Sequence, residues 1–295
     1  MQELRGIFPV LQTPLDERGD IDDGALARQV DFVVACGAHG IVYPVLGSEF
    51  QYLTDGERRR LVELVVCQAA GRAPAVVGVA ATTGVGAAEY AAHARSAGAD
   101  AVVALPPYIA AANREELFAY YAGIAEAAQC PVMIQHSFAG LDSALLSRLL
   151  TEIEHVRYVK EEMAPSAHHI SGVVQGAGDE CWGVFGGALG RWMISEMRRG
   201  AAGFMPAAEV IDVYVQIWDA FQEGDENTAR AIFNRLLPEI NLAGMLGMQV
   251  CKEVLVRRGV IATARMRQPG CAALDAEDQR ELDRILQDLQ ALFRV

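Results

Sequence analysis

The sequence is poor in lysine. Only Lys160 and Lys252 are lysines, and the other 23 basic residues are arginines. Arginine keeps its proton at physiological pH, so almost none of the basic side chains of this chain could serve as a nucleophilic amine. A reaction that needs such an amine therefore depends on one of only two residues.

Long apolar runs and an excess of positive charge are also absent. No stretch approaches the roughly 20 apolar residues of a membrane span, and the N-terminal segment MQELRGIFPVLQTP lacks the charged start, apolar run and small-residue cleavage site of a signal peptide. The net charge of −13 gives a surface that repels phosphate backbones and anionic lipids. We therefore expect no nucleic-acid or membrane partner, and a cytoplasmic location.

The cysteines and histidines lack metal-binding spacing. The six cysteines include no CxxC pair, and most lie in apolar context, as Cys67 does in ELVVCQAA. We expect them to be reduced thiols that pack as small apolar side chains. The six histidines include no HExxH motif, and the adjacent His168 and His169 would point apart on a helix or a strand. The sequence thus indicates neither a metal site nor a cofactor.

Short apolar segments alternate with longer segments of helical periodicity. The expected strands are 6–12, 40–46, 75–81, 101–106, 131–136, 157–161, 182–186 and 202–205, and the expected helices are 23–36, 55–70, 85–97, 113–128, 142–153, 165–173 and 187–198. Strands that are apolar throughout are typical of a parallel sheet buried on both faces. Eight such units predict an α/β fold of the (β/α)8 barrel type. A doubly wound sheet is the alternative, but the number of units and the lack of a GxGxxG motif argue against it.

The end of the chain, from residue 207 onward, has a helical pattern throughout. No linker rich in proline, glycine or serine separates it from the preceding part. We therefore expect a barrel over residues 1–206 and a helical region over 207–295 that packs on it. Within the barrel, Thr54 and Asn113 are residue types that cap helix starts.

Lys160 lies at the carboxyl end of the sixth expected strand, in RYVKEEM. The reacting groups of such a barrel come from the carboxyl ends of its strands. Because side chains alternate along a strand, Tyr158 and Lys160 would both point into the barrel. Burial disfavours a charged ammonium group, and a neutral amine can attack a ketone to form a Schiff base. The alternatives are a salt bridge to Glu161 or Glu162 and a lysine at an exposed strand end. Lys252 is interpreted as a structural helix residue.

Motifs along almost the whole chain resemble those of the dihydrodipicolinate synthase / N-acetylneuraminate lyase family. They are GIFPVLQTPLDERGDID, GAHGIVYPVLGSEFQYLTDGER, VVALPPY, PVMIQH, YVKEE and GVFGGALG, in this order. The resemblance implies a (β/α)8 barrel with C-terminal helices, usually a homotetramer, acting on a small-molecule 2-keto acid with no cofactor. It also implies that Lys160 is the lysine that forms the imine.

The loop after the second expected strand departs from the family pattern. The family has Gly-Thr-Thr-Gly-Glu, and this chain has Val-Leu-Gly-Ser-Glu at residues 45–49. The resemblance implies that Gly47, Ser48 and Glu49 bind the substrate carboxylate through backbone N–H groups and a hydroxyl, and that Ser48 takes part in catalysis. A plain helix cap is the alternative role of Ser48.

Other family positions are also changed. Gln135 stands where the family has a proton-relaying tyrosine; it cannot act as acid or base but can donate a hydrogen bond to a substrate hydroxyl. His136 could titrate near neutrality, although alternation turns it to the other face. Ile109 stands where the family has a tyrosine supplied by a neighbouring subunit, and the segment HSFAGLD at 136–142 lacks the family's substrate-gripping arginine, which argues against lysine biosynthesis. The resemblance also implies substrate contact at Gly187.

Within the family, Gln135 together with SEF, LTDGER, LPPY and GVIATARMRQP looks most like the sugar-acid branch, above all L-2-keto-3-deoxyarabonate dehydratase. That resemblance implies a Schiff-base lyase that removes water from a 2-keto-3-deoxy pentonate to give 2-oxoglutarate semialdehyde. Ser48, Glu49, a water molecule or the substrate carboxylate would then carry the proton. A pyruvate-dependent aldolase and a non-catalytic barrel that binds keto acids are the alternatives.

Overall fold

Eight parallel strands form a closed barrel in the computed structural model, which describes residues 3–137 and 141–295. The strands are β1 (Gly6–Ile7), β2 (Ile41–Tyr43), β3 (Ala75–Gly78), β4 (Ala101–Ala104), β5 (Val132–His136), β6 (Val156–Glu161), β7 (Gly183–Gly186) and β8 (Gly203–Phe204). Strands β2 to β8 pair in chain order, and β8 pairs with β1. A parallel bridge between Val10 and Val42 closes the ring. The predicted (β/α)8 barrel is confirmed.

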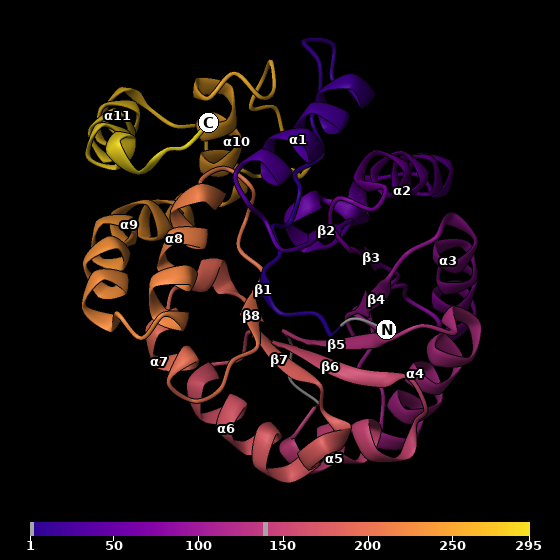
Figure 1. Ribbon diagram of the computed structural model, residues 1–295. Helices are drawn as coiled ribbons and strands as arrows, with labels where there is room; N and C mark the ends of the chain where they lie inside the picture. The colour runs from indigo at the N-terminus through magenta and orange to yellow at the C-terminus, as the bar shows by residue number, and fades with distance from the viewer. Residues whose placement is uncertain (1–2, 138–140) are drawn as a thin grey trace.

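A ring of helices surrounds the barrel (Figure 1). The ring consists of α1 (Asp23–Ala35), α2 (Asp55–Ala69), α3 (Gly84–Ala97), α4 (Arg114–Ala128), α5 (Ser143–Glu152), α6 (Ser166–Ala177), α7 (Met193–Met197) and α8 (Ile211–Gln222). The helix expected over 187–198 is wrong at its start. The backbone turns left-handed at Leu189 and Gly190, so a short 3-10 turn precedes α7.

The predicted C-terminal helices are confirmed as α9 (Glu226–Leu246), α10 (Met248–Arg257) and α11 (Ala276–Leu289). Helix α9 packs against α8, α10 and α11. Helix α8, which begins after residue 207, packs against β1 and completes the ring around the barrel. The division at residue 207 stays a prediction.

The strands bury both of their faces, as their apolar sequences predict. One apolar cluster fills the inside of the barrel, and a larger one lies between the strands and the helices. Along β6, Tyr158 belongs to the inner cluster and Val159 to the outer one. Since side chains alternate along a strand, Lys160 points inward, as expected.

The predicted helix starts at Thr54 and Asn113 are confirmed. Thr54 caps α2 and Asn113 caps α4; each accepts a hydrogen bond from the backbone N–H group three residues later. The carboxylates of Glu57 and Glu116 in turn accept a hydrogen bond from the backbone N–H groups of the caps. Such reciprocal capping satisfies N–H groups that a helix start would otherwise leave free.

All six cysteines are free thiols, but they are not uniformly buried. Cys36 and Cys251 are buried, whereas Cys67 is exposed. Helix α2 buries Leu61, Val65 and Ala69 at helical spacing, and Cys67 falls on the opposite, solvent side. The expectation that Cys67 is buried, which rested on its apolar neighbours in the sequence, is therefore wrong.

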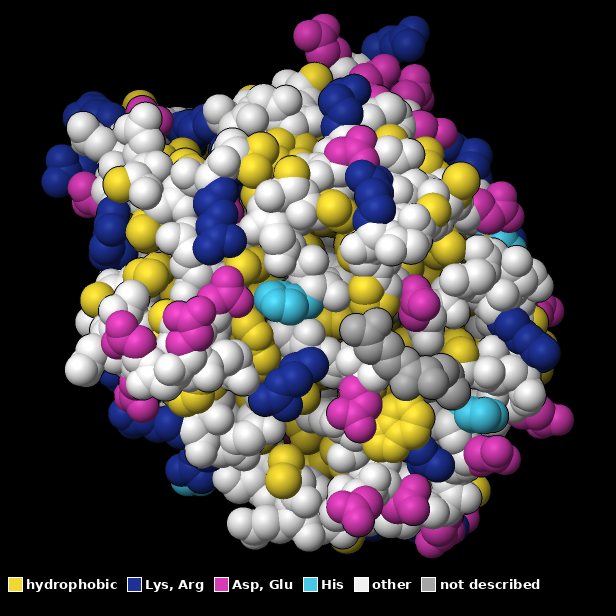
Figure 2. All heavy atoms as spheres, in the orientation of Figure 1, with side chains coloured by type: hydrophobic (Ala, Val, Ile, Leu, Met, Phe, Trp, Pro, Cys, Tyr) yellow, Lys and Arg dark blue, Asp and Glu magenta, His cyan; other side chains and the backbone are white. Residues whose placement is uncertain are grey.

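The outer surface on the side shown in Figure 2 has intermingled basic and acidic side chains, with no broad patch of one sign. Such a face offers no continuous basic surface for a nucleic-acid backbone. Among the helices of the described residues, none is long and apolar enough to cross a membrane.

Glu209, Glu239 and Cys251 form a fully buried cluster where the C-terminal helices meet the barrel. Their ligand-type atoms all lie within 4.8 Å of one another. Over the described residues, the carboxylate oxygens of both glutamates have no hydrogen-bond partner. Burial and the charge of Glu209 raise the pKa of Glu239 well above its ordinary value. Because an unpaired charge in a dry interior is costly, burial favours the protonated form of Glu239 in the folded protein.

Glu239→Gln is therefore expected to stabilise the protein at alkaline pH. In the unfolded chain Glu239 ionises near its ordinary pKa of 4.5, while in the folded state it keeps its proton. The stability that the neutral carboxyl contributes is thus complete below that pKa and is lost as the pH rises toward the raised folded pKa. Glutamine cannot ionise, so the variant should gain unfolding free energy relative to the wild type as the pH rises from 4 to 8.

Denaturant unfolding between pH 4 and pH 8 measures this gain. Glu281→Gln, at an exposed position of α11, serves as the control and should follow the wild type. If Glu239→Gln kept the pH dependence of the wild type, the Glu239 carboxyl would be ionised in the folded protein, and this prediction would be wrong.

Candidate active site

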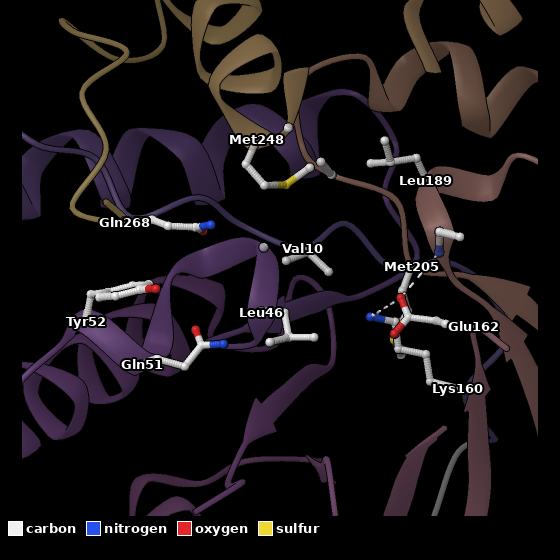
Figure 3. A pocket seen from close by; sticks show the side chains of 14 residues that line it. Val10, Leu46, Gln51, Tyr52, Lys160, Glu162, Leu189, Met205, Met248 and Gln268 are labelled. Atoms are coloured by element: carbon white, nitrogen blue, oxygen red, sulfur yellow. Dashed lines mark hydrogen bonds and ion pairs between the residues drawn. The ribbon is translucent and has the colours of Figure 1, made fainter. Parts of the chain in front are cut away.

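A cavity of about 440 Å³ lies at the carboxyl ends of the strands (Figure 3). Segments that follow five of the strands line it together with the C-terminal region: Val10, Leu46, Gly47, Gln51, Tyr52, Lys160, Glu162, Ala188, Leu189, Met205, Ala207, Gly247, Met248 and Gln268. Among these lining residues, Lys160 is the only basic side chain and Glu162 the only acidic one. This end of a (β/α)8 barrel is where such proteins hold their reacting groups.

Lys160 extends from the end of β6 into the cavity. Its residue surface is only 3% exposed, and its Nζ lies 3.1 Å from Oε1 of Glu162. The salt bridge considered as an alternative role of Lys160 is therefore present. It lies inside the cavity, however, and not at an exposed strand end, so the amine and a carboxylate face the same cavity.

Glu162 is fixed on three sides. Its Oε2 accepts hydrogen bonds from Nε2 of Gln135, at 2.8 Å, and from the hydroxyl of Ser137, and its Oε1 accepts one from the backbone N–H of Ala188, at 3.3 Å. Burial alone would raise the pKa of Glu162, but the Lys160 ammonium and these hydrogen bonds hold it below its ordinary value. Glu162 is therefore a carboxylate at neutral pH, positioned to accept a proton.

Gln135 and Gly187, both expected to contact the substrate, lie behind Glu162 and do not line the cavity. Gln135 stands opposite Lys160 in the register of β5 and β6, and its amide donates to Glu162. A Cβ at Gly187 would overlap the Glu162 carboxyl group. Both residues thus orient Glu162. From the sequence, the proximity of Glu162 to the Lys160 amine was considered only as a salt bridge.

Of the residues in the loop after β2 that were predicted to bind the substrate, only some reach the cavity. Residues Leu46–Ser48 form one turn of 3-10 helix, whose first N–H groups have no acceptor within the turn. Gly47 lines the cavity beside Leu46. Ser48 is fully buried; its hydroxyl donates to the carbonyl of Leu11 at 2.6 Å and accepts from the N–H of Val45 at 3.2 Å. The structure does not bring the Ser48 hydroxyl into the cavity.

Glu49 also turns away from the cavity. Its Oε2 lies 2.7 Å from Nζ of Lys252 on α10, and its Oε1 accepts from the backbone N–H groups of Arg267, at 2.8 Å, and Gln268, at 2.7 Å. Both Glu49 and Lys252 are buried. Burial lowers the pKa of Lys252, and the charge of Glu49 opposes that effect. Lys252 is thus the structural helix residue expected, with Glu49 as its partner.

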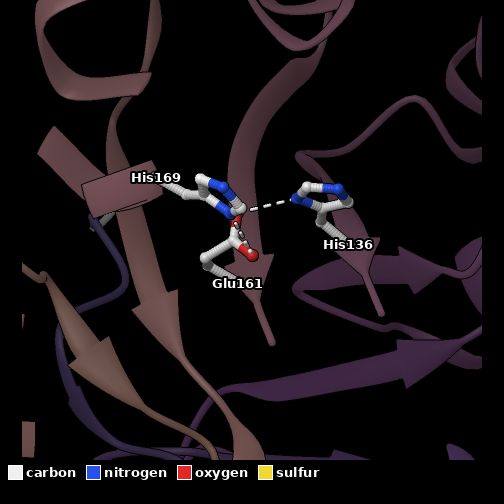
Figure 4. Close-up of side chains that lie close together, drawn as sticks. All are labelled: His136, Glu161 and His169. Atoms are coloured by element: carbon white, nitrogen blue, oxygen red, sulfur yellow. Dashed lines mark hydrogen bonds and ion pairs between the residues drawn. The ribbon is translucent and has the colours of Figure 1, made fainter. Parts of the chain in front are cut away.

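His136 lies on the outer face of β5, as alternation along the strand predicts. Its Nδ1 is 2.8 Å from Oε2 of Glu161, and Nδ1 of His169 is 3.5 Å from Oε1 of the same residue (Figure 4). The three residues are close enough to hold a metal ion. They come from β5, β6 and α6, which no local spacing could reveal. The backbone N–H of Met163 donates to Oε1, so both oxygens of Glu161 already have partners without an ion.

Two further expectations concern the edge of the site. Ile109, at the position of the family's tyrosine from a neighbouring subunit, is 80% exposed. The segment HSFAGLD includes residues 138–140, which lie outside the described residues.

The comparison with known proteins agrees with this architecture. Residues 3–289 match the sequence model of the dihydrodipicolinate synthetase family. The chain belongs to this family. Its members are lyases, and this assignment confirms the resemblance drawn from the motifs.

Individual relatives in the family have different activities. L-2-keto-3-deoxyarabonate dehydratase of Azospirillum brasilense is 31% identical over 272 residues, which cover 90% of this chain and 88% of the relative. 4-hydroxy-tetrahydrodipicolinate synthase of Methanopyrus kandleri is 25% identical over 80% of each chain. The crystal structure of the dihydrodipicolinate synthase from Rhodopseudomonas palustris superimposes with a TM-score of 0.89 at 25% identity, over 97% of this chain and 98% of the other.

Proposed function

We propose that this protein is a Schiff-base lyase that removes water from a 2-keto-3-deoxy sugar acid. The main support is the pair formed by Lys160 Nζ and Glu162 Oε1, 3.1 Å apart, which lines the cavity at the carboxyl ends of the strands. This pair supplies a nucleophile and an acid–base group side by side. The relationship to the A. brasilense dehydratase supports the substrate class, a 2-keto-3-deoxy pentonate that would yield 2-oxoglutarate semialdehyde.

The first step is imine formation at C2 of the substrate. Lys160 loses a proton to Glu162 and attacks the ketone, and the resulting carbinolamine takes a proton from Glu162 and loses water. The protonated imine then draws electrons away from C3. The carboxylate needed for each proton transfer is already in contact with the reacting nitrogen.

The second step is elimination across C3 and C4. Glu162, again a carboxylate, removes a proton from C3 to give an enamine, and its carboxyl then protonates the C4 hydroxyl as the C4–O bond breaks. The unsaturated imine isomerises: a proton moves from C5 to C3 to give an enol at C5, and the enol then loses its hydroxyl proton while C4 gains one, so that an aldehyde forms at C5. Hydrolysis restores Lys160 and releases the product. Glu162 takes the place of the family's tyrosine, which Gln135 cannot do.

The substrate carboxylate would lie against the loop after β2. Leu46 and Gly47 line the cavity at the start of a 3-10 turn, where N–H groups without acceptors suit an anion. A side chain at Gly47 would press on Met248 and Val10, because an ideal Cβ there would lie 3.2 Å from each. Ser48, by its hydrogen bonds to Leu11 and Val45, would act by shaping this turn.

Incubation with a 2-keto-3-deoxy pentonate tests the proposed reaction. Dehydration is expected to give a single product one water lighter than the substrate, detected by mass spectrometry, with no pyruvate. Release of pyruvate and a two-carbon aldehyde would instead identify the aldolase alternative, and an imine without turnover would identify a keto-acid-binding barrel. The homotetramer and the cytoplasmic location stay predictions.

A further inference from the structure

The two sides of the cavity differ in charge. Lys160 and Glu162 occupy one side, and Gln51, Tyr52 and Gln268 project into the cavity from the opposite side, at its mouth (Figure 3). These three side chains are neutral and both donate and accept hydrogen bonds. A substrate bound through C2 at Lys160 would point its far end toward them.

The basic side chains of the C-terminal segment do not line the cavity, although the guanidinium of Arg267 donates to the backbone carbonyl of Tyr52 at 3.3 Å. Arg267, the neighbour of Gln268, pairs with Glu57 through two bonds of 2.8 and 2.9 Å and does not line the cavity. Over the described lining residues, Lys160 is the only cation. The mouth can thus match hydroxyl groups but has no charge to pair with a second carboxylate.

The backbone of Gln268 is held in place by Glu49, which lies outside the cavity. Oε1 of Glu49 accepts hydrogen bonds from the backbone N–H groups of Arg267 and Gln268. Oε2 of Glu49 pairs with Nζ of Lys252, which also donates to the carbonyl of Arg265 at 2.7 Å. A single buried ion pair therefore ties α10 and the segment 265–268 to the loop after β2.

We propose that Gln268, together with Gln51 and Tyr52, selects substrates whose distal end is hydroxylated and uncharged, and that Glu49 and Lys252 are the positioning residues that hold Gln268 at the mouth. This inference rests on the proposed function and assigns the residues that distinguish its aldonic substrates from aldaric ones. A diacid would place its second carboxylate among amides and a phenol, where no cation balances it.

Two matched substrates test the selection: a 2-keto-3-deoxy aldonate and the 2-keto-3-deoxy aldarate of equal length, in which a carboxylate replaces the terminal hydroxymethyl group. The wild type is expected to prefer the aldonate by about 100-fold in kcat/KM. Gln268→Ala should lower kcat/KM for the aldonate about 10-fold. Gln268→Arg should shift the preference toward the aldarate by about 10-fold or more, because it adds the missing cation. Arg265→Ala, exposed and outside the cavity, is the control for the segment.

The positioning pair is tested with Glu49→Gln/Lys252→Met, which removes both charges at once, since either single variant would leave a buried charge unpaired and risk unfolding. The folded double variant is expected to raise KM for the aldonate about fivefold or more, with a smaller change in kcat. An unchanged KM would overturn the positioning role.

Reductive trapping with pyruvate, which has no distal end, tests the Schiff-base function separately from the selection by Gln268. If the wild type traps pyruvate but uses both substrates equally, or if Gln268→Ala and Gln268→Arg leave the preference unchanged, the selection by Gln268 is wrong while the Schiff-base function stands. If the wild type traps no pyruvate, the proposed function itself fails.

Discussion

Glu162→Gln is expected to lower kcat by about 10²–10⁴-fold, the usual contribution of a general acid–base group. Glutamine keeps the size of the side chain and can still hydrogen-bond to Lys160, but it cannot accept or deliver a proton. The imine should still form, although more slowly, because the nucleophile is untouched. Steady-state turnover of the 2-keto-3-deoxy acid, compared with borohydride trapping of the imine, separates the two steps.

Glu161→Gln is the matched control. Glu161 is the adjacent glutamate, but it lies on the outer face of β6 against His136, so its loss should affect turnover far less. The low pKa of Glu162 adds a pH test: activity that needs this carboxylate should decline only as the pH falls below about the ordinary value of 4.5. Turnover in Glu162→Gln within tenfold of the wild type would exclude Glu162 as the proton carrier.

Lys160→Arg is expected to abolish turnover, with a loss of more than about 10⁴-fold. Arginine keeps a positive charge beside Glu162, so the electrostatic environment is largely preserved, but its guanidinium cannot become a neutral amine. Assay of the purified variant at high enzyme concentration measures the residual rate. Thermal unfolding monitors the fold, and activity above one hundredth of the wild type in the folded variant would mean that catalysis needs no imine at Lys160.

The fold could be predicted largely from the sequence because each barrel strand is buried on both faces. That burial leaves uninterrupted apolar segments such as Val76–Val77 and Val102–Val103, separated by amphipathic helices. Several strands are shorter than expected, as β1 is (Gly6–Ile7 instead of 6–12), and the region 187–198 was a further exception. Its composition suits a helix, but Leu189 and Gly190 adopt a left-handed backbone, and neither periodicity nor propensity reveals that local turn.

The candidate site was only partly predictable. Lys160 was found because its rarity and its place at a strand end are visible in one segment. The role of Glu162 depends on its side chain folding back over the end of β6 onto Gln135, and that of Gln268 depends on a contact with Glu49 more than 200 residues earlier. Such long-range contacts follow from tertiary packing and leave no local pattern.

The central claim is that the amine of Lys160 condenses with a 2-keto acid. Borohydride reduction in the presence of pyruvate, followed by peptide mass mapping, tests it directly, and the sequence makes the map simple because Lys252 is the only other lysine. The account predicts one stable adduct, on the peptide that contains Lys160 and absent from Lys160→Arg. No adduct in the wild type, or an adduct that persists in Lys160→Arg, would contradict it.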